Sequence, residues 1–212
     1  MPHHLNADPL LEALQPDLVE EVIVDMIVFT RRGDAEMRSL KIREGDETRD
    51  HLTGDDTAEV IFGRGGADRI EAGQGDDVIH GGRGFDWING GHGADSIFGG
   101  AGRDILKGKR GNDVLNGGDG RDKLSGGAGN DVLTGGRGAD KFIFTNGCGR
   151  DTITDFDDGR DLMSFTRHDG VNSFGDLVVT AHEGGTKVSF GVNYVLLEDV
   201  NTSEIDASDF IF

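Results

Sequence analysis

The sequence predicts an all-β protein whose central part is a parallel β-roll, a solenoid with two nine-residue units in each coil. Glycine supplies 36 of the 212 residues, against about 7% in average proteins, so the backbone must turn often and tightly. The glycines recur every nine residues between residues 45 and 143, and an acidic and a large apolar residue recur in phase with them. This pattern divides the chain into an amino-terminal part (1–44), the array (45–143) and a tail (144–212).

The amino-terminal part is expected to form a short helix and a β-hairpin. Asp8-Pro9 caps a helix that ends before Pro16. The β-branched residues between Leu18 and Phe29 favour a strand, although the same segment also fits a helical spacing. A turn at residues 31–34 then leads to a second strand from Met37 to Ile42.

The array keeps its register, without insertion, through ten units that start at Gly54, and a weaker eleventh unit precedes them from Gly45. Positions seven to nine of each unit are expected to form a short strand, and the six residues before them a tight turn. The sixth position is acidic, at Glu59, Asp68, Asp77, Asp86, Asp95, Asp104, Asp113, Asp122, Asp131 and Asp140. The eighth position is large and apolar, at Ile61, Ile70, Ile79, Ile88, Ile97, Leu106, Leu115, Leu124, Leu133 and Phe142.

The turns have the chemistry of a calcium site. Glycines at positions one, two and four permit a positive φ, so that carbonyl oxygens point inward, and position six adds a carboxylate. Calcium prefers about six to eight such oxygens, whereas magnesium demands a smaller octahedral cage. The pattern Gly-Gly-x-Gly-x-Asp-x-U-x, in which U is a large apolar residue, resembles the RTX (repeats-in-toxin) calcium-binding repeats.

This resemblance implies a right-handed β-roll in which each ion lies between neighbouring turns, held by two aspartates and by glycine carbonyls. The aspartates form two columns, one of Asp68, Asp86, Asp104, Asp122 and Asp140 and one of Asp77, Asp95, Asp113 and Asp131. Their gaps predict seven Ca²⁺ ions, and marginal sites at Asp50 and Glu59 raise the number to nine. The glycines expected to contribute are Gly66, Gly75, Gly82, Gly84, Gly91, Gly93, Gly100, Gly102, Gly111, Gly118, Gly120, Gly127 and Gly129.

The acidic surplus is largely explained by this demand for ligands. Seven divalent ions carry +14 and would change the formal net charge from −19 to −5. Without metal, the aspartates of a column would repel one another at about the 4.8 Å spacing of neighbouring strands. One buried apolar residue in nine cannot offset the chain entropy, so the array is expected to be largely disordered without calcium.

The two outer faces of the roll differ in character. One carries Val60, Val78, Val114 and Val132 with Phe62 and Phe98, and the hairpin or the tail is expected to cover it. The other carries Arg69, Trp87, Lys123 and Lys141, which offers an alternative function in binding extracellular polysaccharide or a cell surface, although an ordinary mixed solvent face is the favoured explanation.

The tail resembles the carboxy-terminal region of secreted serralysin-type proteases, through Asp151-Thr-Ile-Thr-Asp-Phe156, Asp161-Leu162 and the ending Asp209-Phe-Ile-Phe212. The resemblance implies a β-sandwich-like cap and an uncleaved signal for the type I secretion apparatus, and hence a secreted, extracellular protein. The residues themselves predict strands at 177–179, 187–190 and 194–197, which would close the end of the roll.

Other functions are disfavoured. The net charge of −19 argues against nucleic acid as a partner, no apolar stretch is long enough for a transmembrane segment, and no Sec signal peptide is evident. Cys148 is the single cysteine, so no intramolecular disulfide forms. His182-Glu183 lacks the second histidine of a zinc protease motif, and no catalytic motif is complete, so we expect no enzyme. An accessory module of an exported protease or alginate epimerase remains an alternative.

Overall fold

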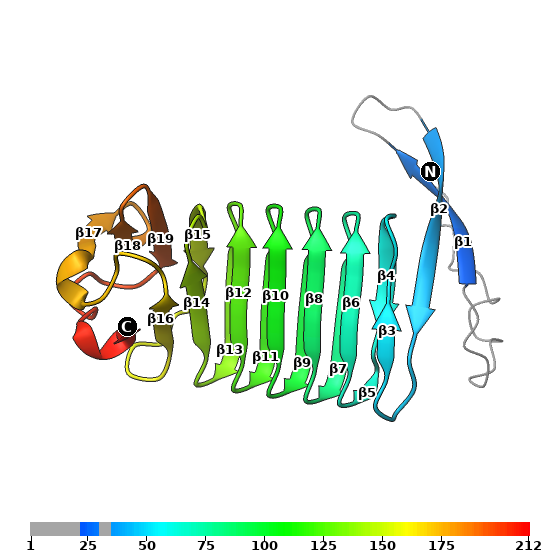
Figure 1. Cartoon of the computed structure of the whole chain (residues 1–212), viewed down its shortest axis with the longest axis horizontal. Helices are drawn as coiled ribbons and strands as arrows, with labels where there is room; N and C mark the ends of the chain where they lie inside the picture. The colour runs from blue at the N-terminus through cyan, green and yellow to red at the C-terminus, as the bar shows by residue number, and fades with distance from the viewer. Residues whose placement is uncertain (1–21, 30–34) are drawn as a thin grey trace, which may run out of the picture.

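The computed structural model describes residues 22–29 and 35–212, with side chains described from Lys41 onward. The chain forms a solenoid in which two sheets lie face to face (Figure 1). This architecture confirms the predicted parallel β-roll. The predicted helix after Asp8 and the turn at residues 31–34 lie outside the described residues. Among the described residues, no helix has the length and apolarity needed to cross a membrane.

Twelve strands form the first sheet. In order along the main path they are β1 (Val22–Phe29), β2 (Ala35–Glu44), β4 (Glu59–Phe62), β7 (Val78–Gly84), β9 (Ser96–Gly102), β11 (Val114–Gly120), β13 (Val132–Gly138), β15 (Arg150–Ile153), β19 (Asn193–Glu198), β18 (Gly185–Phe190) and β17 (Val178–His182), and β5 (Gly65–Gly66) pairs with β7.

Eight strands form the second sheet. They are β20 (Phe210–Ile211), β16 (Leu162–Arg167), β14 (Lys141–Thr145), β12 (Lys123–Ala128), β10 (Ile105–Arg110), β8 (Trp87–His92), β6 (Arg69–Gln74) and β3 (His51–Thr53). The described chain also contains two 3-10 turns, Phe174–Asp176 and Ala207–Asp209.

The register between coils is 18 residues, as two nine-residue units per coil require. Ile79 pairs with Ile97 in the first sheet, and Ile88 pairs with Leu106 in the second. Every apolar side chain at the eighth position from Ile61 to Phe142 is 0% exposed, so these residues form the core between the sheets. The strands are longer than the predicted three residues because the turn glycines of successive coils also pair, as Gly82 does with Gly100.

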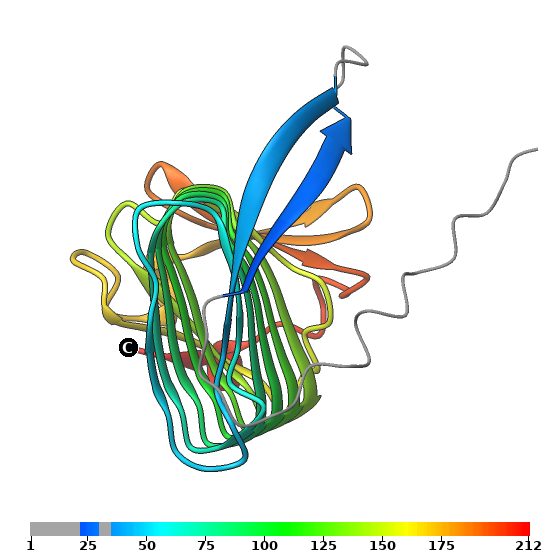
Figure 2. The same cartoon turned by 90° about the vertical axis from the view of Figure 1, so that its right-hand side faces the viewer.

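The amino-terminal hairpin extends the first sheet in its own plane. Strands β1 and β2 pair antiparallel, and β2 pairs in parallel with β4, with Lys41 opposite Glu59 (Figure 2). The expectation that the hairpin or the tail covers the valine face is therefore wrong. Val114 is 43% exposed and Val132 is 37% exposed on that face. Apolar composition predicts strands, but it does not distinguish a strand added at the edge of a sheet from one packed on its face.

The tail continues both sheets and closes the end of the roll. Strand β15 pairs with β19, which starts the antiparallel set β19-β18-β17, while β16 and β20 extend the second sheet. Between these sheet ends lies an aromatic cluster of Phe144, Phe165, Phe190 and Phe210. The predicted tail strands are thus present, and the aromatic cluster forms the core of the cap.

Candidate metal sites

The acidic residues at position six form two continuous columns, one at each edge of the roll. The backbone N–H of each donates to Oδ1 of the aspartate one coil later, at 2.9 Å from Asp68 to Asp86 and 2.8 Å from Asp86 to Asp104. The second column repeats this bond, at 2.9 Å from Asp95 to Asp113. One carboxylate oxygen of each aspartate is thereby used to hold neighbouring coils together.

The other carboxylate oxygen has no hydrogen-bond partner. All nine aspartates are at most 2% exposed, and a buried oxygen without a partner loses its hydration without compensation. The unpartnered oxygens are Oδ2 of Asp68, Asp77, Asp86, Asp95, Asp104, Asp113, Asp122, Asp131 and Asp140. These are the nine aspartates that the repeat pattern singled out as metal ligands.

Except at Asp77, whose unit begins with Ala72, each unpartnered oxygen faces a hollow that exists because position one is glycine. A Cβ built on Gly81 would lie 2.6 Å from Oδ2 of Asp86 and 2.6 Å from the carbonyl oxygen of Gly99 in the next coil. The same holds at Gly117, with Asp122 and Gly135 as neighbours. Position one is therefore glycine for space and not for a positive φ, and its carbonyl is a candidate ligand that the sequence pattern did not identify.

The glycines at positions two and four do adopt a positive φ, as at Gly82 (106°) and Gly84 (124°). A side chain at Gly84 would collide with the carbonyl of Gly66 in the preceding coil. Among the nine units from residue 63, two carry a larger residue at position two, Arg64 (φ 72°) and Lys109 (φ 89°). Both hold a conformation that is costly for a residue with a side chain.

Burial raises the pKa of the column aspartates. The pKa of Asp104 rises to about 7 because of burial, against the lowering effect of the hydrogen bond from Asp86, and the negative charges of Asp122 and Asp86 raise it further. Asp113 also reaches about 7, with Asp131 and Asp95 as its charged neighbours. A cation between two such carboxylates would stabilise their charged forms and so oppose both shifts.

The amino-terminal ends of the columns are satisfied by the protein itself. The backbone N–H of Asp46 donates to Oδ2 of Asp50 at 2.8 Å. Oε2 of Glu59 accepts from the backbone of Asp55 at 3.0 Å, and its Oε1 lies 2.8 Å from the guanidinium of Arg43. The two positions expected as marginal sites thus already have protein partners.

The columns continue into the tail through two aspartates that the repeat pattern missed. Asp131 donates its N–H to Asp151 and Asp140 donates its N–H to Asp161, over separations of 20 and 21 residues instead of 18. Both keep the Asp-x-apolar signature of the array, in Asp151-Thr-Ile and Asp161-Leu-Met. That signature, followed without a fixed period, would have identified them.

These last aspartates end the columns. Oδ2 of Asp161 accepts from the backbone N–H of Asp157 at 3.0 Å. The Cys148 thiol donates to the carboxylate of Asp151, and burial, followed by the charge of Asp151, raises the thiol pKa to about 12. The cysteine therefore has a structural role at the end of one column.

The arrangement fits a hard cation held largely by backbone oxygens. Among the residues whose side chains are described, no three His, Cys, Asp or Glu side chains gather into one metal-binding group. A site in this array must therefore combine the carboxylates of neighbouring coils with carbonyls such as those at position one. Calcium accepts such a set of oxygen ligands.

A model of the RTX calcium-binding nonapeptide repeat (4 copies) matches residues 44–79, 53–88, 71–106 and 107–142. No curated protein matches the sequence. Among solved structures, the extracellular lipase of Serratia marcescens is 18% identical over 86% of this chain and 41% of its own, with a TM-score of 0.48. The R2 subunit of the Azotobacter vinelandii mannuronan C5-epimerase is 28% identical over 57% of this chain and 88% of its own, with a TM-score of 0.45. The R3 subunit of the same epimerase is 30% identical over 61% of this chain and 79% of its own, with a TM-score of 0.33. The chain thus spans less than half the length of the lipase.

Proposed function

We propose that this chain, which carries RTX calcium-binding nonapeptide repeats over residues 44–142, is a secreted protein whose β-roll folds when calcium fills the gaps between its turns. The observation that carries the proposal is the set of nine buried carboxylate oxygens without a partner. The protein would have a structural role or a role in binding a partner, and no catalytic function is proposed.

The ions would lie between successive coils of each column. The unpartnered oxygens support five gaps from Asp68 to Asp161 and four from Asp77 to Asp151, which gives at most nine ions. Ala72 stands at position one of the unit that contains Asp77, so its methyl group narrows that gap. Glycine carbonyls at positions two and four remain predicted ligands beside those of position one.

Folding coupled to calcium follows from the energetics of the columns. Without an ion, each buried carboxylate is either charged beside like charges or protonated at a cost near neutral pH. A bound divalent ion supplies the missing partner and stabilises only the folded state. Extracellular calcium, at millimolar concentration, matches the affinities of weak oxygen sites, which supports a protein that folds after export.

Calorimetric titration with calcium, with circular dichroism recorded in parallel, tests this proposal. We expect eight or nine ions to bind and β structure to appear over the same range of calcium concentration. Binding of one or two ions, or an unchanged spectrum between chelator and millimolar calcium, would contradict it. Magnesium at the same concentrations is the control and should induce far less structure.

A further inference from the structure

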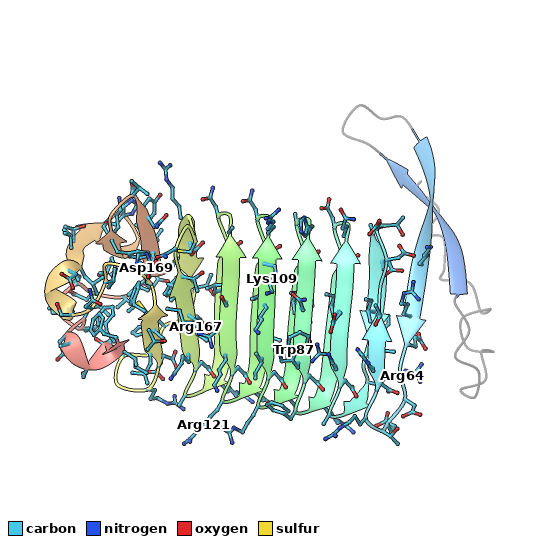
Figure 3. The ribbon with its side chains drawn as sticks, viewed as in Figure 1. Arg64, Trp87, Lys109, Arg121, Arg167 and Asp169 are labelled. Atoms are coloured by element: carbon cyan, nitrogen blue, oxygen red, sulfur yellow. The ribbon has the colours of Figure 1, made fainter. Side chains whose placement is uncertain are left out.

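A groove runs across the outer face of the second sheet, on the side of the roll opposite the valine face. It has a volume of about 530 Å³ and crosses β8, β10, β12, β14 and β16. Its basic side chains are Lys107, Lys109, Arg110 and Arg167, with His92 beside them, and there is no carboxylate among the lining residues. Figure 3 shows Lys109 and Arg167 on this face, together with Trp87.

The groove concentrates positive charge in a protein whose net charge is −19. Across residues 41–212, the recorded ion pairs include none of the four lysines and arginines that line it. Burial lowers the pKa of Lys107, and repulsion from Lys109, Arg167 and Arg69 lowers it further. Glu71 pairs with Arg69 outside the groove, whereas Asp169 accepts a hydrogen bond from the lining residue Asn146 and so places one carboxylate at the edge of the groove.

Lys109 departs from the repeat at a cost to the backbone. It stands at position two, where seven of the nine units from residue 63 carry glycine, and its φ is 89°. The other exception, Arg64, forms an ion pair with Glu44. Lys109 forms no ion pair among the described side chains and lines the groove instead. Backbone strain retained in this way is typical of functional positions.

The groove also offers neutral hydrogen-bonding groups. Oδ1 of Asn89 is buried and has no partner, and Ser125 and Thr145 line the same hollow. The face of Trp87, just outside the groove, is occupied by the guanidinium of Arg69 at 4.2 Å and the ammonium of Lys107 at 5.1 Å. No Phe, Tyr or Trp is among the lining residues, so the groove has no platform for stacking nucleic-acid bases.

We propose that this groove binds an anionic saccharide, whose carboxylate or sulfate groups pair with Lys109, Arg110 and Arg167. The sugar hydroxyls bind Asn89 and Ser125. These groups come from the successive strands β8, β10, β12 and β16, so they are spread along the roll, which suits an extended oligomer. This binding site is additional to the calcium columns, which lie in the turns.

The test uses the full-length protein saturated with calcium and measures binding by calorimetry. The probes are tetragalacturonate, a sulfated heparin tetrasaccharide and uncharged maltotetraose. We expect at least one charged oligomer to bind, with an affinity that falls as sodium chloride is raised, and maltotetraose not to bind. Absence of binding by both charged probes overturns the proposal, as does tighter binding of a single-stranded DNA oligomer.

Matched variants locate the site. Lys109→Gly and Arg167→Gln together are expected to weaken binding about tenfold or more, since each removes a charge-assisted contact. Lys109→Gly restores the repeat and should not lower the melting temperature in calcium. Arg64→Gly is the same kind of change at position two outside the groove, and Arg121→Gln removes a distant charge (Figure 3). Both controls should bind as the wild type does.

Calcium ions can bridge acidic ligands to acidic proteins, and the variants distinguish that route. The Lys109→Gly and Arg167→Gln variant retains every column aspartate, so bridged binding would persist in it unchanged. Equal affinity of this variant and the wild type therefore overturns the proposal. A loss of affinity equal to that of the Arg64→Gly control also overturns it.

Discussion

Position one of the repeat determines whether the hollow beside each aspartate is open. A methyl group on Gly99 would lie 2.6 Å from the carbonyl oxygen of Gly117 and 2.8 Å from Oδ2 of Asp104. We expect Gly99→Ala to reduce the calcium stoichiometry by one and to destabilise the loaded protein by about 1–3 kcal/mol through overpacking. Calorimetry and denaturant titration in calcium measure the two effects.

Ala72 provides the reverse experiment in the same chain. Ala72→Gly should open the hollow at Asp77 and either add an ion or tighten one, while leaving the hydrogen bond from Asp77 to Asp95 in place. If Gly99→Ala and Ala72→Gly change the stoichiometry in the same direction, position one is not the determinant that its geometry indicates.

The buried carboxylates also predict how pH acts on the metal-free protein. The folded pKa is raised to about 7 at Asp104 and Asp113 and to about 6 at Asp131, above an unfolded value of about 3.9. Protonation therefore stabilises the metal-free fold at low pH, and this contribution is lost as pH rises through about 6 to 7. In chelator, we expect more β structure at pH 5 than at pH 8.

With calcium present the dependence reverses, because the ion binds the deprotonated carboxylates. Calcium affinity should fall as the pH decreases from 8 to 5. Circular dichroism in chelator and calcium titrations at both pH values measure these opposite trends. An identical chelator spectrum at the two pH values would show that the column carboxylates do not control folding.

At the level of elements, the cap depends on its aromatic cluster. The Phe165 ring centroid lies 4.9 Å from that of Phe190 and 5.4 Å from that of Phe144, and the side chain is 1% exposed. Phe165→Ala should destabilise the calcium-loaded protein by about 3–5 kcal/mol, in the range of large cavities. Phe98→Ala, at a 37% exposed ring on the first sheet, is the control and should cost much less. Similar costs for both would mean that the cap does not limit the stability of the roll.

The sequence predicted the elements that repeat and missed those that depend on context. The nine-residue period alone located the buried apolar residues from Ile61 to Phe142 and the aspartates at both edges of the roll, because each of these positions recurs in the same environment. Asp151 and Asp161 were missed as members of the columns because two- and three-residue insertions shift their period. The sequence could not show that position one must be glycine for space, because the atoms that limit this space belong to the neighbouring coil.

At the scale of the whole molecule, the columns predict that calcium binding and folding form one cooperative transition. Each interior aspartate lies between two gaps, so loss of one ion leaves carboxylates of neighbouring sites without a partner. Unfolding free energy should rise by about 1.4 kcal/mol per tenfold increase in free calcium for every ion released. Denaturant titrations at several buffered calcium concentrations give this slope.

The slope should correspond to the same number of ions that calorimetry counts. Stacked repeats can instead unfold coil by coil, since each contacts only its neighbours. In that case the slope would report two or three ions while calorimetry still counted eight or nine. Substitution of Asp104, in the middle of a column, by Asn separates these outcomes further. A single transition predicts that the whole folding curve shifts to higher calcium concentration. Independent coils predict two separate folding transitions.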